Sequence, residues 1–174
     1  MIGDEGSGFW IARRVVQAVA RDLDHRGPHT ALTELVLGLV DMRSERQIPG
    51  RDQRLMDLLA WAHARRPVEL AVAARLVAEV EEDPVARGII QLAVDRLQNT
   101  LTALGEEMGP LVLGGSVVAP GSPVGERLVE QLDCEVRHAR DGVAGSALIG
   151  LRGLGVLADE AARGRVLLTL EQGM

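Results

Sequence analysis

The sequence contains no lysine and no tyrosine, and its aromatic residues are limited to Phe9, Trp10 and Trp61. Arginine therefore supplies all 19 basic residues against 25 acidic ones, and the formal net charge is −6. An acidic chain with so few aromatic rings lacks the positive surface that binds nucleic-acid phosphates and the stacking platform that holds single strands. We therefore expect no nucleic-acid partner.

Cysteine and long apolar runs are equally scarce. Cys134 is the single cysteine, so it forms no internal disulfide and cannot by itself hold a zinc or iron–sulfur site. The four histidines show no ligand spacing on a common face, which predicts no metal site in the chain. No apolar run approaches the ~20 residues that cross a bilayer, and the acidic start has no signal-peptide pattern. These features predict one cytoplasmic domain over residues 1–174.

The first two thirds of the chain have the apolar periodicity of α-helices. Spacings of three and four residues predict helices over residues 8–24, about 30–39, 55–61, 67–80 and 84–104. Thr30 or His29 is the expected start of the second helix, and Pro49-Gly50 marks a turn before the third. Asp83-Pro84 is an N-cap followed by proline at the first helical position, and it predicts the start of the longest helix. Leu104 is placed on that helix's apolar face, and Gly105, or Gly109 with Pro110, is the expected end.

The pattern changes after residue 110. The apolar run 111–113 between Pro110 and Gly114-Gly115 is typical of a buried parallel strand. Ser122-Pro123 predicts a helix to about residue 132, and residues 134–137 read as a second strand, which completes a βαβ unit. A helix over about 147–154 should follow. The tail at 166–170 is compatible with either a strand or a short helix. The expected fold class is α/β, predominantly helical, with a small parallel β core.

The first ten residues are the strongest functional signal. Gly3-Asp4-Glu5-Gly6-Ser7 is an acidic, glycine-rich turn that leads directly into the first predicted helix, with Ser7 as its N-cap. Polar groups at a helix start, on glycines that allow a ligand to approach the backbone, are typical of a binding corner. A capped helix after an ordinary turn is the alternative on these residues alone.

The order of four short motifs resembles a known family. The turn at residues 3–10, Asp83-Pro84, the strand and loop at 111–117 and the Gly/Ala-rich segment 141–155 occur in the order seen in the N-acetylglucosamine kinase group of the BadF/BadG/BcrA/BcrD ATPase family. That family belongs to the actin/hexokinase superfamily. The resemblance implies the second, C-terminal lobe of an actin-like (ribonuclease H-like) ATPase domain.

The resemblance also implies roles for individual residues. Gly3 would hold the turn and Asp4 would accept hydrogen bonds from the hydroxyls of an amino sugar such as N-acetylglucosamine, while Glu5 braces the loop. Gly114, Gly115 and Ser116 would face the adenosine of ATP. ATP and Mg²⁺ are the implied cofactors, with Mg²⁺ not ligated by this chain.

The sequence also departs from the family pattern. Val80 and Glu82 occupy positions where relatives often have glycine, and Ala119-Pro120 replaces a polar position after the adenosine loop, so adenine contacts are in doubt there. The Asp-Gly-Gly-Gly-Thr phosphate hairpin of the family's first lobe does not occur. Because phosphoryl transfer depends on groups placed around the γ-phosphate, we expect no catalysis by this lobe alone and no catalytic residue in this chain.

Two functions remain open from the sequence. The first is an ATP-dependent sugar kinase-like protein that contributes sugar- and adenosine-binding surface and works with an absent N-terminal lobe. The second is a non-catalytic helical module that dimerises or binds a partner through an exposed sheet edge at residues 111–113 and an apolar helix face.

Overall fold

The computed structural model describes residues 3–41, 49–105, 110–139, 142–157 and 159–172, and every structural statement below concerns these residues. The α-helices are α1 (Gly8–Leu23), α2 (Leu32–Leu37), α3 (Gln53–His63), α4 (Pro67–Leu70), α5 (Leu76–Glu79), α6 (Pro84–Leu104), α7 (Pro123–Glu130), α8 (Gly142–Gly153) and α9 (Glu160–Gln172). Two 3₁₀ segments, η1 (Ala71–Arg75) and η2 (Ser116–Val118), and two strands, β1 (Leu111–Leu113) and β2 (Val136–His138), complete the described elements.

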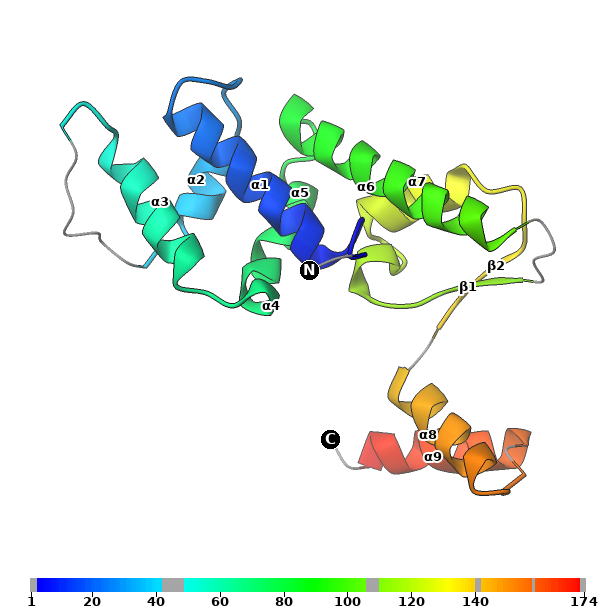
Figure 1. Cartoon of the computed structure of the whole chain (residues 1–174). Helices are drawn as coiled ribbons and strands as arrows, with labels where there is room; N and C mark the ends of the chain where they lie inside the picture. Colours follow the sequence, from blue (N-terminus) through cyan, green and yellow to red (C-terminus); the bar gives the residue numbers. More distant parts are fainter. Residues whose placement is uncertain (1–2, 42–48, 106–109, 140–141, 158, 173–174) are drawn as a thin grey trace.

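Helix α1 is the centre of the hydrophobic core. Its apolar residues recur every three or four positions, so one face is buried while arginines occupy the other. The buried residues of α1 are Trp10, Ile11, Ala12, Val15, Val19 and Leu23. Helices α2, α3, α4 and α6 and the segment η1 all contact α1. Figure 1 shows α1 between the α2–α3 side of the molecule and the long α6.

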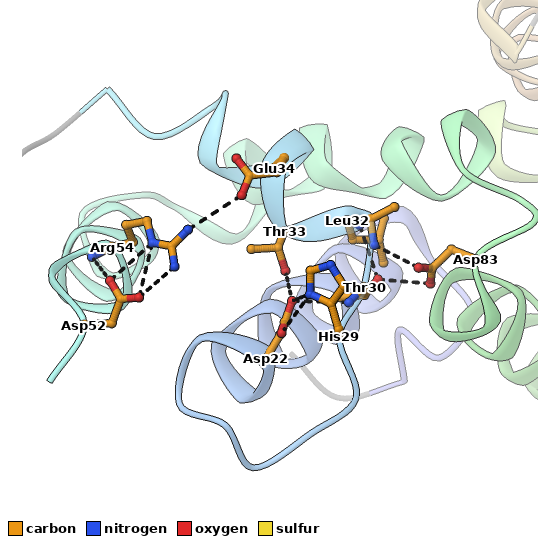
Figure 2. A network of polar contacts seen from close by, with 10 residues as sticks. Asp22, His29, Thr30, Leu32, Thr33, Glu34, Asp52, Arg54 and Asp83 are labelled. Carbon is orange, nitrogen blue, oxygen red and sulfur yellow. Dashed lines mark hydrogen bonds and ion pairs between the residues drawn. The ribbon is translucent and has the colours of Figure 1, made fainter.

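One carboxylate joins two helix starts that are 52 residues apart in the sequence (Figure 2). Asp83 caps α6 as predicted, since its Oδ1 accepts from the backbone N–H groups of Val85 (2.8 Å) and Ala86 (3.0 Å). The same carboxylate also accepts from the Thr30 hydroxyl (3.0 Å) and from the backbone N–H of Ala31 (2.8 Å). Asp83 therefore fixes the start of α2 against the start of α6.

A second carboxylate holds the turn between α1 and α2 (Figure 2). Asp22 Oδ2 accepts from the backbone N–H of Thr30 (3.2 Å), from the hydroxyl of Thr33 (2.5 Å) and from His29 Nδ1 (3.1 Å). Burial raises the pKa of Asp22, but these hydrogen bonds and the charge of His29 outweigh it and lower the pKa below the usual value. The two buried polar side chains of the core, Thr30 and Thr33, thus both donate to carboxylates.

Several predicted boundaries were wrong. Helix α2 begins at Leu32, two residues after Thr30, and ends at Leu37, before Leu39. The Thr30 hydroxyl accepts from the N–H of Leu32 (3.2 Å), and the N–H of Ala31 donates to the distant Asp83. The predicted helix over 67–80 is divided into α4, η1 and α5, and Val80 lies outside it with φ −137°. In α6, Leu104 is 67% exposed rather than on the buried face.

The predicted βαβ unit is confirmed, but its second strand begins later and its first strand is less buried than predicted. Strands β1 and β2 pair in parallel across α7, with Leu111 opposite Val136 and Leu113 opposite His138. The second strand begins later than predicted, at Val136, so Cys134 precedes it. Leu113 is buried but Val112 is 59% exposed, because within the described residues the sheet has two strands and a single covered face. The predicted parallel strand is therefore confirmed, but it is buried only in part.

The C-terminal segment forms a helical hairpin, α8 with α9. Helix α8 begins at Gly142, earlier than the predicted residue 147, and the tail that was left open is helical. The two helices contact each other, and none of their described side chains belongs to the main hydrophobic core. Figure 1 shows the hairpin set apart from the rest of the molecule. None of the described helices has the length and apolar character needed to cross a bilayer.

Candidate functional site

The N-terminal turn has the conformation that its glycines predict. Gly3 and Gly6 both have φ +78°, in the region that favours glycine, and the N–H of Ser7 donates to the carbonyl of Asp4 (3.0 Å). Ser7 is confirmed as the N-cap of α1, because its Oγ accepts from the backbone N–H of Trp10 (3.2 Å). A methyl group on Gly6 would lie 2.8 Å from Leu97 Cγ, so the turn is seated directly on α6.

The two acidic side chains of the turn have different surroundings. Glu5 lies 3.7 Å from Arg96 Nη1, which ties the turn to α6 in the bracing role expected for it. Asp4 is half-buried, and its Oδ2 is shielded from water with no hydrogen-bond donor among the described residues. A carboxylate oxygen without a donor retains its capacity to accept a hydrogen bond.

The glycine loop after β1 leads into α7. Gly115 has φ +98°, and η2 follows it at once. Ser122 caps α7 by accepting from the N–H of Gly125 (3.4 Å), as predicted, and its own hydroxyl donates to the carbonyl of Val117. An added Cβ on Gly125 would lie 2.9 Å from the carbonyl of Val118, so only glycine allows α7 to pack this closely on η2.

The start of α1 and the loop after β1 meet at one groove of about 420 Å³. Gly8 contributes from α1 and Ser116 from η2, and the helical segment 71–78 forms a third wall. Gly8 is closely packed there, since a Cβ on it would lie 3.8 Å from both the Ala71 Cβ and the Val117 Cγ2. The lining is largely apolar, and Arg75 is its charged residue.

The groove contains some of the predicted site residues and excludes others. Ser116 lines it, whereas Gly3, Asp4, Gly114 and Gly115 do not. Gly114 instead faces Ala139, the residue that follows β2, because an added Cβ would lie 3.5 Å from the Ala139 Cβ. The first residues of α1 and Ser116, the last residue of the glycine loop, therefore line the same groove, whereas the turn at residues 3–7 does not.

Sequence reasoning missed the wall formed by residues 71–78. Its signal was the run of small residues at 71–74, which permits close approach to the first turn of α1. Val80 and Glu82, the departures noted above, do not line the groove, whereas Ala119 and Pro120 do. The predicted departure at Pro120 therefore lies at the groove itself and makes this wall apolar.

The fold is similar to that of part of a kinase. The structure superposes on the crystal structure of a putative N-acetylglucosamine kinase from Chromobacterium violaceum with a TM-score of 0.55 and 29% sequence identity. The match covers 74% of this chain and 40% of the Chromobacterium protein, so the chain spans less than half of the protein that it matches. Comparison with models of known protein families gave no match, and neither did comparison with curated protein sequences.

Proposed function

We propose that this chain is the C-terminal lobe of an ATP-dependent sugar kinase of the N-acetylglucosamine kinase type in the BadF/BadG/BcrA/BcrD family. In this proposal it supplies sugar- and adenosine-binding surface and does not transfer phosphate by itself. The observation that carries it is the shared groove: Gly8 and Ser116, from two motifs more than 100 residues apart, line one hollow in a fold that matches a kinase.

The groove suits a nucleoside better than a sugar. Its apolar walls would take the flat face of a base, Ser116 offers a hydroxyl to a ribose, and Arg75 can stack on a base or bind phosphate. Asp4 lies outside the lining, and its half-buried carboxylate is the acceptor that we assign to sugar hydroxyls. Mg²⁺ would enter with the nucleotide, because no three His, Cys, Asp or Glu side chains of the described residues are grouped to hold it.

Thermal unfolding with ATP and with N-acetylglucosamine tests the proposal. A ligand at 100 times its Kd stabilises the folded state by about 2.7 kcal/mol, which is a clear shift in Tm. Ala78→Phe should fill the groove and remove the ATP shift, while Ala103→Phe, an exposed alanine on α6 outside the groove, should leave it unchanged. Asp4→Ala should remove the sugar shift only. No shift with either ligand would contradict the proposal.

A second candidate is a non-catalytic interaction module, and the hairpin α8–α9 favours it. Ile149, Leu154 and Leu157 are at least 72% exposed, and apolar surface of this kind marks sites of association. If the chain self-associates and its Tm does not change with ATP or N-acetylglucosamine, this function is favoured over that of a sugar kinase lobe.

A further inference from the structure

A separate groove of about 280 Å³ lies between the second half of α1 and the first half of α6. Arg14 and Arg21 line one wall, and the apolar residues Val85, Ile89 and Leu92 line the other. Neither the resemblance to sugar kinases nor the proposed function uses this groove. Its volume is just below the roughly 300–1,000 Å³ of pockets for drug-sized ligands, so it suits a smaller molecule.

The two arginines of the groove have no acidic partner among the described residues, although the chain is acidic overall. Arg14 is held in place by Trp10, with the guanidinium carbon 4.9 Å from the ring centroid. Its Nε is buried without an acceptor in the described part of the chain. Arg21 follows two turns later on α1, about 10 Å along the axis, and lies on the same side of the helix. Arg14 is thus held by its contact with Trp10, whereas Arg21 is exposed.

Gly88 leaves open space on the α6 wall of this groove. It lies inside α6, where glycine costs about 1 kcal/mol relative to alanine. Its backbone is helical, and an added Cβ would meet no atom within 4 Å, so neither conformation nor packing requires glycine here. Gly88 does line the groove, and a larger side chain at this position would project into open space.

We infer that the groove between α1 and α6 binds a compact amphipathic carboxylate. Arg14 and Arg21 hold the carboxylate through charge-assisted hydrogen bonds, and the apolar tail lies over Gly88 between Val85 and Leu92. A volume of 280 Å³ is the volume of about nine water molecules in the liquid. A ligand of this volume has about ten non-hydrogen atoms, counting its carboxylate and its apolar tail. Octanoate has this size and is the probe that we choose.

Isothermal titration calorimetry with three probes separates charge from apolar contact. Octanoate carries both features, acetate carries the charge alone and octanamide carries the apolar chain alone. We expect octanoate to bind at least tenfold more tightly than either. The double change Arg14→Gln with Arg21→Gln should weaken octanoate at least tenfold, whereas Arg13→Gln, an exposed arginine of α1 outside the groove, should not change it.

A variant that fills the groove gives a second, independent readout. Gly88→Leu should abolish octanoate binding while leaving Tm equal or higher, because leucine is a better helix former and meets open space. The inference is overturned if octanoate gives no heat of binding, if acetate or octanamide binds as tightly, or if binding persists in Gly88→Leu or in the double arginine variant.

Discussion

At the scale of single residues, the two glycines of the N-terminal turn share a φ of +78° but differ in their surroundings. Gly3 has no atom near the position of a Cβ, whereas at Gly6 that position is 2.8 Å from Leu97 Cγ and 3.2 Å from the backbone oxygen of Ala93. Gly3→Ala should cost only the strain of positive φ, about 1–3 kcal/mol. Gly6→Ala should cost about 1–3 kcal/mol more from overpacking. Urea unfolding of both variants measures the difference, and equal losses would show that the turn is not seated on α6.

Asp83 should be the most costly helix cap to remove. Asp83→Ala loses the N-cap of α6, which is worth about 1 kcal/mol, and leaves the buried Thr30 hydroxyl without its acceptor, which costs about 1–3 kcal/mol more. Asp52→Ala is the matched control, because Asp52 caps α3 and its side chain bonds, among the described residues, to Arg54 alone. Its loss should stay near 1 kcal/mol. Similar losses in the two variants would contradict the bridge between α2 and α6.

The carboxylates of Asp83 and Asp22 predict how the free energy of unfolding depends on pH. Burial raises the pKa of Asp83, but the hydrogen bonds from Ala31, Ala86, Thr30 and Val85 lower it below its usual value, and the pKa of Asp22 is lowered in the same sense.

The pKa values of both groups are therefore lower in the folded state than in the unfolded state. Their contribution is fully present above the unfolded pKa of about 3.9 and is lost as pH falls through the folded pKa. We expect the free energy of unfolding to decrease steeply below about pH 4. The double variant Asp22→Asn with Asp83→Asn should show a smaller decrease in urea unfolding at pH 6 to 3, and an unchanged slope would contradict this assignment.

At the scale of elements, the hairpin α8–α9 should be dispensable for folding of the rest. Its buried apolar residues, Ala144 and Ala162, lie outside the main core, and β2 is already joined to β1 by the N–H of Ala139, which donates to the carbonyl of Leu113 (2.8 Å). Removal of residues 140–174 should therefore shift Tm by no more than about 2–4 °C, the effect of 1 kcal/mol in a domain of this size. Loss of cooperative unfolding, measured by circular dichroism, would show that the hairpin supports the core.

The elements that could be predicted from sequence are those fixed by local signals. Helix α1 has an apolar period and Ser7 as its cap, α6 has Asp83-Pro84, and the βαβ unit has short apolar runs bounded by glycine and proline. At the start of α2, the Thr30 hydroxyl accepts from the N–H of Leu32, which is a local contact. The contact of the preceding N–H, that of Ala31, could not be predicted, because its carboxylate comes from residue 83. The break in the helix over 67–79 could not be predicted either, since it occurs where η1 packs on the first turn of α1.

The candidate site was predictable only in part, for the same reason. The turn at residues 3–7 and the loop at 114–116 carry recognisable glycines, and Ser116 does line the groove. The wall formed by residues 71–78 has no motif, because its role follows from packing against Gly8. The assignments of Asp4 to sugar and of Gly114 and Gly115 to adenosine remain predictions.

At the scale of the whole molecule, α1 forms a wall of both grooves. Its first turn, with Gly8 and Ile11, lines the groove proposed for a nucleoside, and its second half, from Arg14 to Arg21, lines the groove proposed for a carboxylate. Because the helix is rigid and central to the core, a ligand in either groove would contact the element on which most of the fold is packed. Both ligands should therefore raise Tm by stabilising the folded state.

The exposed apolar side chains of the hairpin predict that the chain self-associates. Leu154 and Leu157, between α8 and α9, are 81% and 82% exposed, and burying a leucine side chain contributes about 1.5–3 kcal/mol. Light scattering after size exclusion should give a mass that rises with protein concentration. The double change Leu154→Glu with Leu157→Glu should restore the monomer mass, because a charge at each position opposes burial. Val68→Glu, at a residue that is 71% exposed on α4, is the control and should leave association unchanged. A monomer mass at every concentration would contradict both this prediction and the alternative function as an interaction module.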